Sequence, residues 1–120
     1  MKIAITSSGK SLADKVDERF GRAKYFVIVD TNKPDKVNII ENSQNLNLQQ
    51  GAGIQAAQTI SNENVDALIT GNCGPKAFKT LQAAGIKIFT GASGTIKEAI
   101  DDLNAGKLTE IASPNVKGHW

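Results

Sequence analysis

The chain has few of the residues on which many common sites depend. Its 120 residues include one cysteine, one histidine, one tryptophan and one tyrosine, and aromatic residues make up 5% of the total. A single cysteine excludes an intramolecular disulfide framework. One cysteine and one histidine are also too few for a closed structural zinc site, which takes about four ligands. The scarcity of aromatic side chains argues against a stacking surface for single-stranded nucleic acid.

Charge and hydropathy show no strong bias. Fourteen basic and twelve acidic side chains give a net charge of +2, which does not favour a nucleic-acid partner. No apolar run has the length of a signal peptide or approaches the ~18 residues of a membrane span. We therefore expect a cytoplasmic protein without a membrane partner. The length, with 40% hydrophobic and 22% charged residues, predicts one globular domain over residues 1–120.

Residue patterns predict five strands and three helices. The strands are expected at Lys2–Thr6, Lys24–Asp30, Val37–Glu41, Asp66–Thr70 and Ile86–Thr90. Apolar spacing predicts helices after Gly53, from Pro75 and after Thr95, where Glu98 completes a capping box. The second and third strands are close enough for an antiparallel hairpin, and later strands alternate with helices. The sequence thus predicts an α/β fold with a mixed five-stranded sheet. Asn42–Gln50 and Pro114–Trp120 are expected to be irregular.

Three loops should meet at the edge of this sheet where ligands usually bind, beyond the carboxyl ends of the parallel strands. They are Thr6–Lys10, Gly71–Pro75 and Thr90–Thr95. Each precedes a segment that could be helical, so each could offer backbone N–H groups and the positive end of a helix dipole. A simple turn is the plainer interpretation of any one loop. Three such loops together favour an anionic ligand.

Nucleotide-binding and catalytic signatures are incomplete. Gly9-Lys10-Ser11 resembles the end of a P-loop, but Ala4 stands where the motif needs its first glycine. Gly51–Ala56 has the spelling of a dinucleotide loop without the preceding strand or the acidic residue that binds ribose. No nucleophile–histidine–carboxylate set is evident, and the first strand carries no carboxylate. We therefore expect no catalytic activity.

The two candidate metal ligands each have an alternative interpretation. Cys73 follows a strand and precedes a helix N-terminus, where a thiolate is stabilised. It could equally be a small, half-buried packing residue. His119 is the sole imidazole and stands beside Trp120, and a mobile tail is the plainer interpretation of that pair.

Several motifs resemble the dinitrogenase iron–molybdenum cofactor biosynthesis family, which includes the NifX and NafY carriers and the carboxy-terminal part of NifB. In chain order the matching segments include Ser8-Gly9, Arg19-Phe20-Gly21-Arg22-Ala23, Gly51-Ala52-Gly53, Gly74-Pro75 and Gly85-Ile86. The resemblance implies a ribonuclease-H-like fold with helices on both faces of the sheet and without the nuclease carboxylates. It also implies binding of an iron–sulfur or iron–molybdenum cluster, or its precursor, for delivery to a partner. Some relatives are similar to a protein that carries a molybdenum–copper sulfide cluster.

The implied cargo is a large anion with soft metals, which suits a thiolate, an imidazole and N–H donors. We expect Cys73 and His119 to bind metal directly. The candidate cluster-binding residues are Ser8, Gly9, Lys10, Arg19, Arg22, Gly51, Gly53, Asn72, Gly74 and Lys76. One thiolate cannot enclose a cluster, so we expect labile binding by a monomer or a weak homodimer, with cluster donor and acceptor proteins as partners.

Two other functions fit the sequence. One is a flavodoxin-like module that binds phosphate or a nucleotide at Thr6–Ser11, although the chain lacks the aromatic residues that usually sandwich a flavin. The other is a regulatory domain without a ligand.

Overall fold

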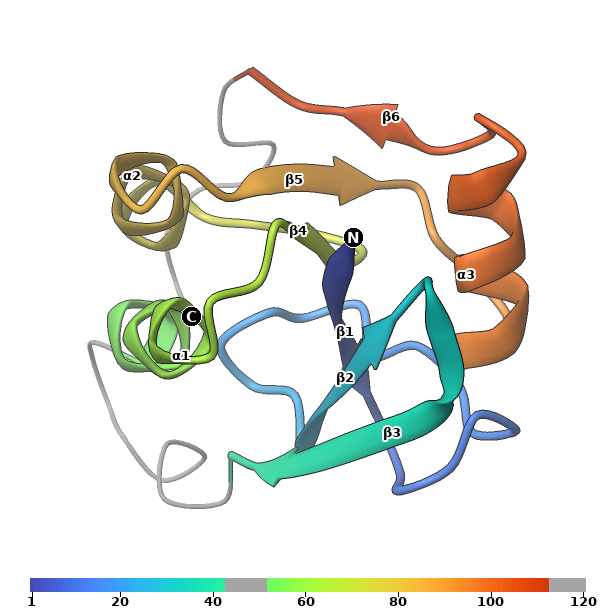
Figure 1. Ribbon diagram of the computed structural model, residues 1–120. Coiled ribbons are helices and arrows are strands. Elements are labelled where there is room, and N and C mark those ends of the chain that lie inside the picture. The colour runs from blue at the N-terminus through green and yellow to red at the C-terminus, as the bar shows by residue number, and fades with distance from the viewer. Residues whose placement is uncertain (43–51, 113–120) are drawn as a thin grey trace.

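A mixed sheet forms the centre of the molecule (Figure 1). The structure is a computed structural model that describes residues 1–42 and 52–112, and within them six strands have the order β3-β2-β1-β4-β5-β6. The strands are β1 (Lys2–Ser7), β2 (Tyr25–Asp30), β3 (Lys33–Glu41), β4 (Ala67–Ile69), β5 (Lys87–Thr90) and β6 (Thr109–Glu110). β1, β4 and β5 are parallel, whereas β2, β3 and β6 run antiparallel to their neighbours. Three carboxyl strand ends therefore share one edge.

The predicted hairpin is confirmed. β2 pairs antiparallel with β3, and Val27 lies opposite Ile39. β3 begins at Lys33, ahead of the predicted start at Val37, because the pairing continues past a register shift between Val29 and Asp30. The first half of β3 is polar, so it lacks the apolar alternation from which a strand is predicted.

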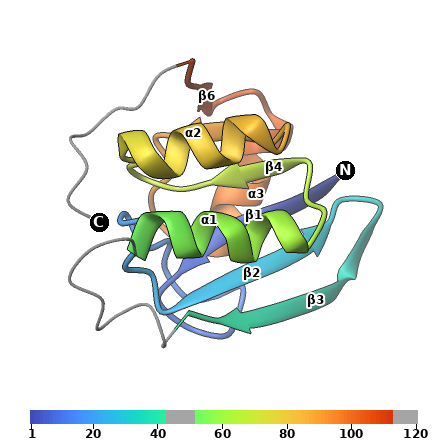
Figure 2. The same ribbon diagram turned by 90° about the vertical axis from the view of Figure 1, so that its left-hand side faces the viewer.

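The helices cover both faces of the sheet, as predicted. They are α1 (Ala52–Asn62), α2 (Pro75–Ala83) and α3 (Ile96–Asn104). α1 and α2 lie side by side on one face, and α3 lies on the other (Figures 1 and 2). The predicted capping box is present: the Thr95 hydroxyl accepts the N–H of Glu98 at 3.2 Å, and the Glu98 carboxylate accepts the N–H of Thr95 at 3.2 Å.

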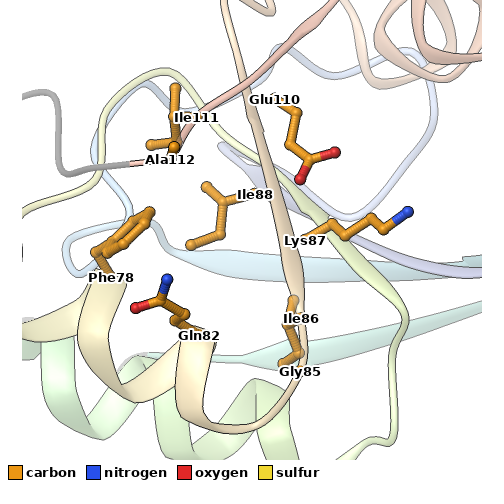
Figure 3. Close-up of a pocket in the computed structure, with 9 residues that line it drawn as sticks. All are labelled: Phe78, Gln82, Gly85, Ile86, Lys87, Ile88, Glu110, Ile111 and Ala112. Atoms are coloured by element: carbon orange, nitrogen blue, oxygen red, sulfur yellow. The ribbon is translucent and has the colours of Figure 1, made fainter.

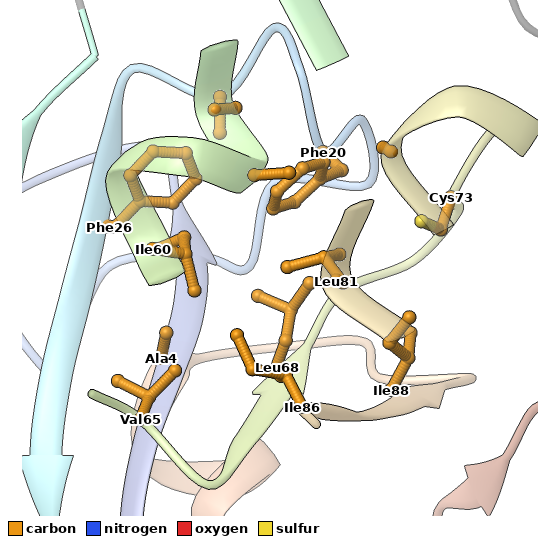
Figure 4. Packing of buried hydrophobic residues seen from close by; sticks show 14 of the residues in the cluster. Ala4, Phe20, Phe26, Ile60, Val65, Leu68, Cys73, Leu81, Ile86 and Ile88 are labelled. Atoms are coloured by element: carbon orange, nitrogen blue, oxygen red, sulfur yellow. The ribbon is translucent and has the colours of Figure 1, made fainter. Parts of the chain in front are cut away.

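Two hydrophobic cores lie on opposite faces because successive side chains of a strand point in opposite directions. Ala4, Phe26 and Leu68 pack toward α1 and α2, together with Phe20 from the segment that follows β1 (Figure 4). The other core contains Ile3, Ile5, Val27, Ile69 and Ile96. The largest of these side chains are fully buried, and each contributes about 1.5–3 kcal/mol of hydrophobic stabilisation.

The predicted number of strands was wrong. Thr109 and Glu110 form a sixth strand, β6, opposite Thr90 and Phe89 of β5. Two residues are too few for any periodic pattern, so this strand is recognised only by its pairing with the edge of β5.

No helix follows Thr6–Lys10: residues 8–24 form turns and isolated bridges. The ribonuclease-H-like label stays a prediction, and the expected irregular segments lie almost wholly outside the described residues. Among the helices that the structure describes, none could cross a membrane.

Candidate functional site

A segment from Asp14 to Gly21, here the crossing segment, runs over the edge where β1, β4 and β5 end. Its Val16 N–H donates to the carbonyl of Gly94, after β5, at 2.9 Å. Its Asp17 N–H donates to the carbonyl of Thr6, in β1, at 2.9 Å. Beyond β4, the Asn72 N–H donates to the Glu18 carbonyl at 2.8 Å. The crossing segment therefore contacts all three predicted binding loops. These and neighbouring contacts decide which backbone N–H groups remain available to a ligand.

The helix N-terminus that follows the loop Thr90–Thr95 does not leave donors for an anion. The N–H of Ile96 donates to the Asp14 carbonyl at 2.8 Å, and the N–H of Lys97 donates to the Leu12 carbonyl at 3.0 Å. The next donor, Glu98 N–H, is bonded to the Thr95 hydroxyl in the capping box. The first turn of α3 is thus saturated by the protein itself, and this loop serves to anchor the crossing segment.

The loop Thr6–Lys10 is closed in a similar way. Both the N–H and the hydroxyl of Ser8 donate to the Lys15 carbonyl at 3.0 Å, and the Gly9 N–H donates to the Ser7 hydroxyl at 3.2 Å. A Cβ on Gly9 would overlap the carboxyl group of Asp14, which therefore lies directly against this turn. The Asp14 carboxylate disfavours an anion here, and the N–H groups of Ser8 and Gly9 already have acceptors within the protein.

Lys10 faces a different part of the edge from the one predicted. Its ammonium lies 5.5 Å from the centre of the Tyr25 ring and 3.8 Å from the Glu41 carboxylate. Both partners are at the ends of the β2–β3 hairpin. The side chain is 63% exposed, so these contacts are weak, but they hold the charge at the end of the β2–β3 hairpin.

The loop Gly71–Pro75 differs from the other two because the N-terminus of α2 has no cap. The N-cap residue is Gly74, which has no side chain, and Pro75 has no N–H. The first N–H groups of the helix then belong to Lys76 and Ala77 and lie at the positive end of the helix dipole. Lys76 is exposed at the same turn. This terminus is suited to an anion.

The crossing segment adds further positive charge to this end. Arg19 pairs with Asn72 in an isolated parallel bridge, two residues before the N-cap. Its guanidinium Nε lies 3.7 Å from the Asp17 carboxylate, and its side chain is 54% exposed. Arg22 is half-buried and follows Gly21, which packs so closely on the start of α1 that an added Cβ would lie 2.8 Å from Gly53 N. α1 and α2 start at this same end (Figure 2).

We call this combination the α2 surface, which consists of Arg19, Arg22, Gly53, Asn72, Gly74 and Lys76. The structure brings these six predicted residues to one end of the α1–α2 layer. Lys10 lies at the end of the β2–β3 hairpin, and Ser8 and Gly9 lie against Lys15 and Asp14. Gly51 and His119 lie outside the described residues. Sequence reasoning gave no role to Asp17, which holds Arg19, because nothing in the local pattern reveals the path of the crossing segment.

Cys73 lies in the core beneath the α2 surface. It is completely buried, with its sulfur directed toward the cluster of Phe20, Leu81 and Ile88 (Figure 4). Its thiol donates weakly to the Gly74 carbonyl at 3.7 Å. Burial raises the pKa of the Cys73 thiol to about 12, since desolvation disfavours the charged form. Desolvation of the buried thiol therefore outweighs the stabilisation of a thiolate that was expected from the helix N-terminus. In this conformation Cys73 is a packing residue.

The α2 surface is not part of either of two cavities in the described residues. A groove of about 320 Å³ lies between α2, β5 and β6 and is lined mainly by Phe78, Ile86, Ile88 and Ile111 (Figure 3). A cavity of about 250 Å³ lies beside α3, at Leu12, Val29 and Ile100. Within residues 1–42 and 52–112, no three His, Cys, Asp or Glu side chains are grouped to hold a metal ion.

Fold and site together define a small α/β domain with a basic, uncapped helix N-terminus at the carboxyl edge of its sheet. The chain belongs to the dinitrogenase iron-molybdenum cofactor family, whose model matches residues 1–106. This confirms the family that the motifs indicated.

Solved structures and a curated relative agree with this assignment. The apo form of the orange protein from Desulfovibrio gigas has a TM-score of 0.92 and 40% identity, covering 96% of both chains. A protein of Thermotoga described as NifB-like has a TM-score of 0.83 and 38% identity over 98% of both chains. An uncharacterised protein of Methanocaldococcus jannaschii is 34% identical over 113 residues, which is 92% of each chain.

Proposed function

We propose that this protein binds an anionic metal–sulfur cluster, or its precursor, on the α2 surface and carries it to a partner protein without catalysing a reaction. The observation that supports this most directly is the uncapped N-terminus of α2, flanked by Arg19 and Lys76, in a chain of the iron-molybdenum cofactor family. The cargo is an iron–sulfur cluster, an iron–molybdenum cluster or another molybdenum sulfide.

The chemistry of the α2 surface suits such a cargo. Cluster sulfides carry negative charge and accept hydrogen bonds from backbone N–H groups, as in other iron–sulfur proteins. The helix dipole contributes a partial positive charge at the same point, and the arginine and lysine side chains add full charges. Arg19 and Lys76 are exposed, so a polynuclear anion can approach both cations from solvent.

Direct ligation by Cys73 and His119 stays a prediction. For Cys73 it requires the Gly71–Pro75 turn to open and the thiol to lose its proton, against the burial that raises its pKa. We therefore assign the initial binding to N–H donors and cations. A metal–sulfur bond would be a second step that follows displacement of Cys73 from the core.

Anaerobic titration with tetrathiomolybdate tests the proposal, because this soft sulfide dianion has a visible spectrum that reports binding. Bound molybdenum is measured by equilibrium dialysis. Each exposed cation on the surface contributes about 0.7–1 kcal/mol, so Arg19→Ala and Lys76→Ala should each weaken binding about three- to fivefold and together by about tenfold or more.

Lys97→Ala is the matched control, since it removes an exposed positive charge from α3 on the opposite face and should change affinity less than twofold. Lys10→Ala should behave like this control because its ammonium lies at Tyr25 and Glu41. Equal losses in all four variants would reveal non-specific charge attraction, and absence of binding by the wild type would refute the proposal.

Anaerobic isolation from cells, with elemental analysis and a visible spectrum, identifies the natural cargo. Iron or molybdenum with sulfide bands is expected. A flavin spectrum would favour the flavodoxin-like alternative, which the bonded donors at Ser8 and Gly9 disfavour. A protein without metal or flavin would favour the regulatory alternative.

A further inference from the structure

Gly71 lies where the crossing segment approaches the turn before α2. A Cβ at this position would lie 2.7 Å from Glu18 Cα and 2.9 Å from both Glu18 Cβ and the Glu18 carbonyl oxygen, whereas real Cβ atoms essentially never come within 3.0 Å of another heavy atom. Gly71 is not among the glycines with positive φ. Glycine is therefore required here for close approach and not for the backbone conformation.

This close approach determines where Arg19 lies. The Asn72 N–H donates to the Glu18 carbonyl at 2.8 Å, and the neighbouring Arg19 is paired with Asn72. Paired residues of adjacent extended segments direct their side chains to the same side. The Asp17 carboxylate accepts the Arg19 N–H at 3.0 Å and lies 3.7 Å from its Nε, so the arginine moves with the backbone of the crossing segment. Two of the three atoms that a Cβ would meet are backbone atoms.

We propose that Gly71 is a positioning residue for cargo binding: its lack of a side chain allows the crossing segment to hold Arg19 beside the N-terminus of α2. This inference rests on the proposed function, because it assumes that Arg19 faces the cargo. A side chain at residue 71 would push Glu18 and Arg19 outward together and separate the cation from the helix N–H donors. Gly71 itself need not touch the cargo.

A double-mutant cycle tests the role of Gly71. Tetrathiomolybdate affinity is measured for the wild type, Gly71→Ala, Arg19→Ala and the double variant. If Gly71 acts through Arg19, Gly71→Ala weakens binding about as much as Arg19→Ala, by about three- to fivefold, and the double variant binds no more weakly than either single one. Affinity of Gly71→Ala within twofold of the wild type would overturn the inference. Losses that multiply in the double variant would also overturn it.

Gly85→Ala is the matched control for loss of stability. Gly85 has φ of +75° at the other end of α2, and nothing lies within 4 Å of an added Cβ. This variant should melt at a lower temperature with unchanged affinity. A loss of affinity equal to that of Gly71→Ala would mean that destabilisation alone weakens binding, which contradicts positioning. If Gly71→Ala does not fold, the cycle is run in a Glu18→Gly background, where one of the three clashing atoms is absent.

The proposed function and the positioning role of Gly71 can fail separately. If the wild type does not bind tetrathiomolybdate, the proposed function fails. If the wild type binds it, and Arg19→Ala weakens binding but the cycle is additive, only the role of Gly71 fails.

Discussion

Cys73 should react with alkylating reagents much more slowly in the folded protein than in the unfolded chain. Burial raises its pKa from 9.0 to about 12, and the thiolate is the nucleophile. Three pKa units correspond to about a thousandfold less thiolate at pH 8, and complete burial of the residue adds a barrier to the reagent. We expect iodoacetamide to modify the native protein at least about a thousand times more slowly than the protein in denaturant.

Mass spectrometry of samples quenched over time measures both rates without ambiguity, because the chain has one cysteine. A native rate within tenfold of the unfolded rate would refute the reasoning. It would show a thiolate accessible at the α2 N-terminus and would support direct metal ligation by Cys73.

The same pKa shift predicts how the free energy of unfolding depends on pH. Between pH 9.0 and about 12 the unfolded chain has lost the Cys73 proton while the folded chain retains it, so the free energy of unfolding falls as the pH rises. Each unit above pH 9.0 costs about 1.4 kcal/mol. At a pH near 10.5 the wild type should therefore have lost about 2 kcal/mol that Cys73→Ala does not lose. Parallel curves for the two proteins would contradict the shift.

Two further predictions concern stability and are measured by denaturant titration. Thr95→Ala removes the hydroxyl that accepts the Glu98 N–H in the capping box, whereas the backbone N–H of residue 95 can still donate to the Glu98 carboxylate. The variant should lower the free energy of unfolding by about 1 kcal/mol without weakening tetrathiomolybdate binding, since α3 lies on the opposite face; an unchanged free energy would show that the hydroxyl cap contributes nothing. Asn42 is fully buried and donates through Nδ2 to the carbonyls of Ala23 at 2.8 Å and Gly21 at 3.3 Å. Asn42→Ala should therefore cost about 1–3 kcal/mol, and a cost below 0.5 kcal/mol would mean that water replaces the amide.

Local sequence was sufficient to predict most of the fold. The apolar run of β2 and the Thr95–Glu98 pair act over a few residues, so their patterns are visible in the chain itself. The hairpin and the three helices were predicted for the same reason. β6 could not be found in this way, because Thr109 and Glu110 become a strand through the exposed edge of β5.

The site was less predictable because its donors are decided by contacts between distant parts of the chain. All three loops have suitable residues, but the N–H groups of Ile96 and Lys97 are bonded to carbonyls of Asp14 and Leu12, and no local pattern encodes that pairing. The burial of Cys73 is similar: the sequence shows a cysteine before a helix, whereas the packing of Phe20 against the same core is a tertiary fact.

The separation of the two cores by the sheet has a practical consequence for experiments. Asp101 is exposed on α3, across the sheet from the α2 surface. Asp101→Cys would add a second thiol, and the unreactive Cys73 would leave it as the sole target for a dye at pH 8. A fluorophore attached there reports on binding and partner encounter through the tumbling of the whole domain, without occupying the surface on which the cargo is proposed to sit.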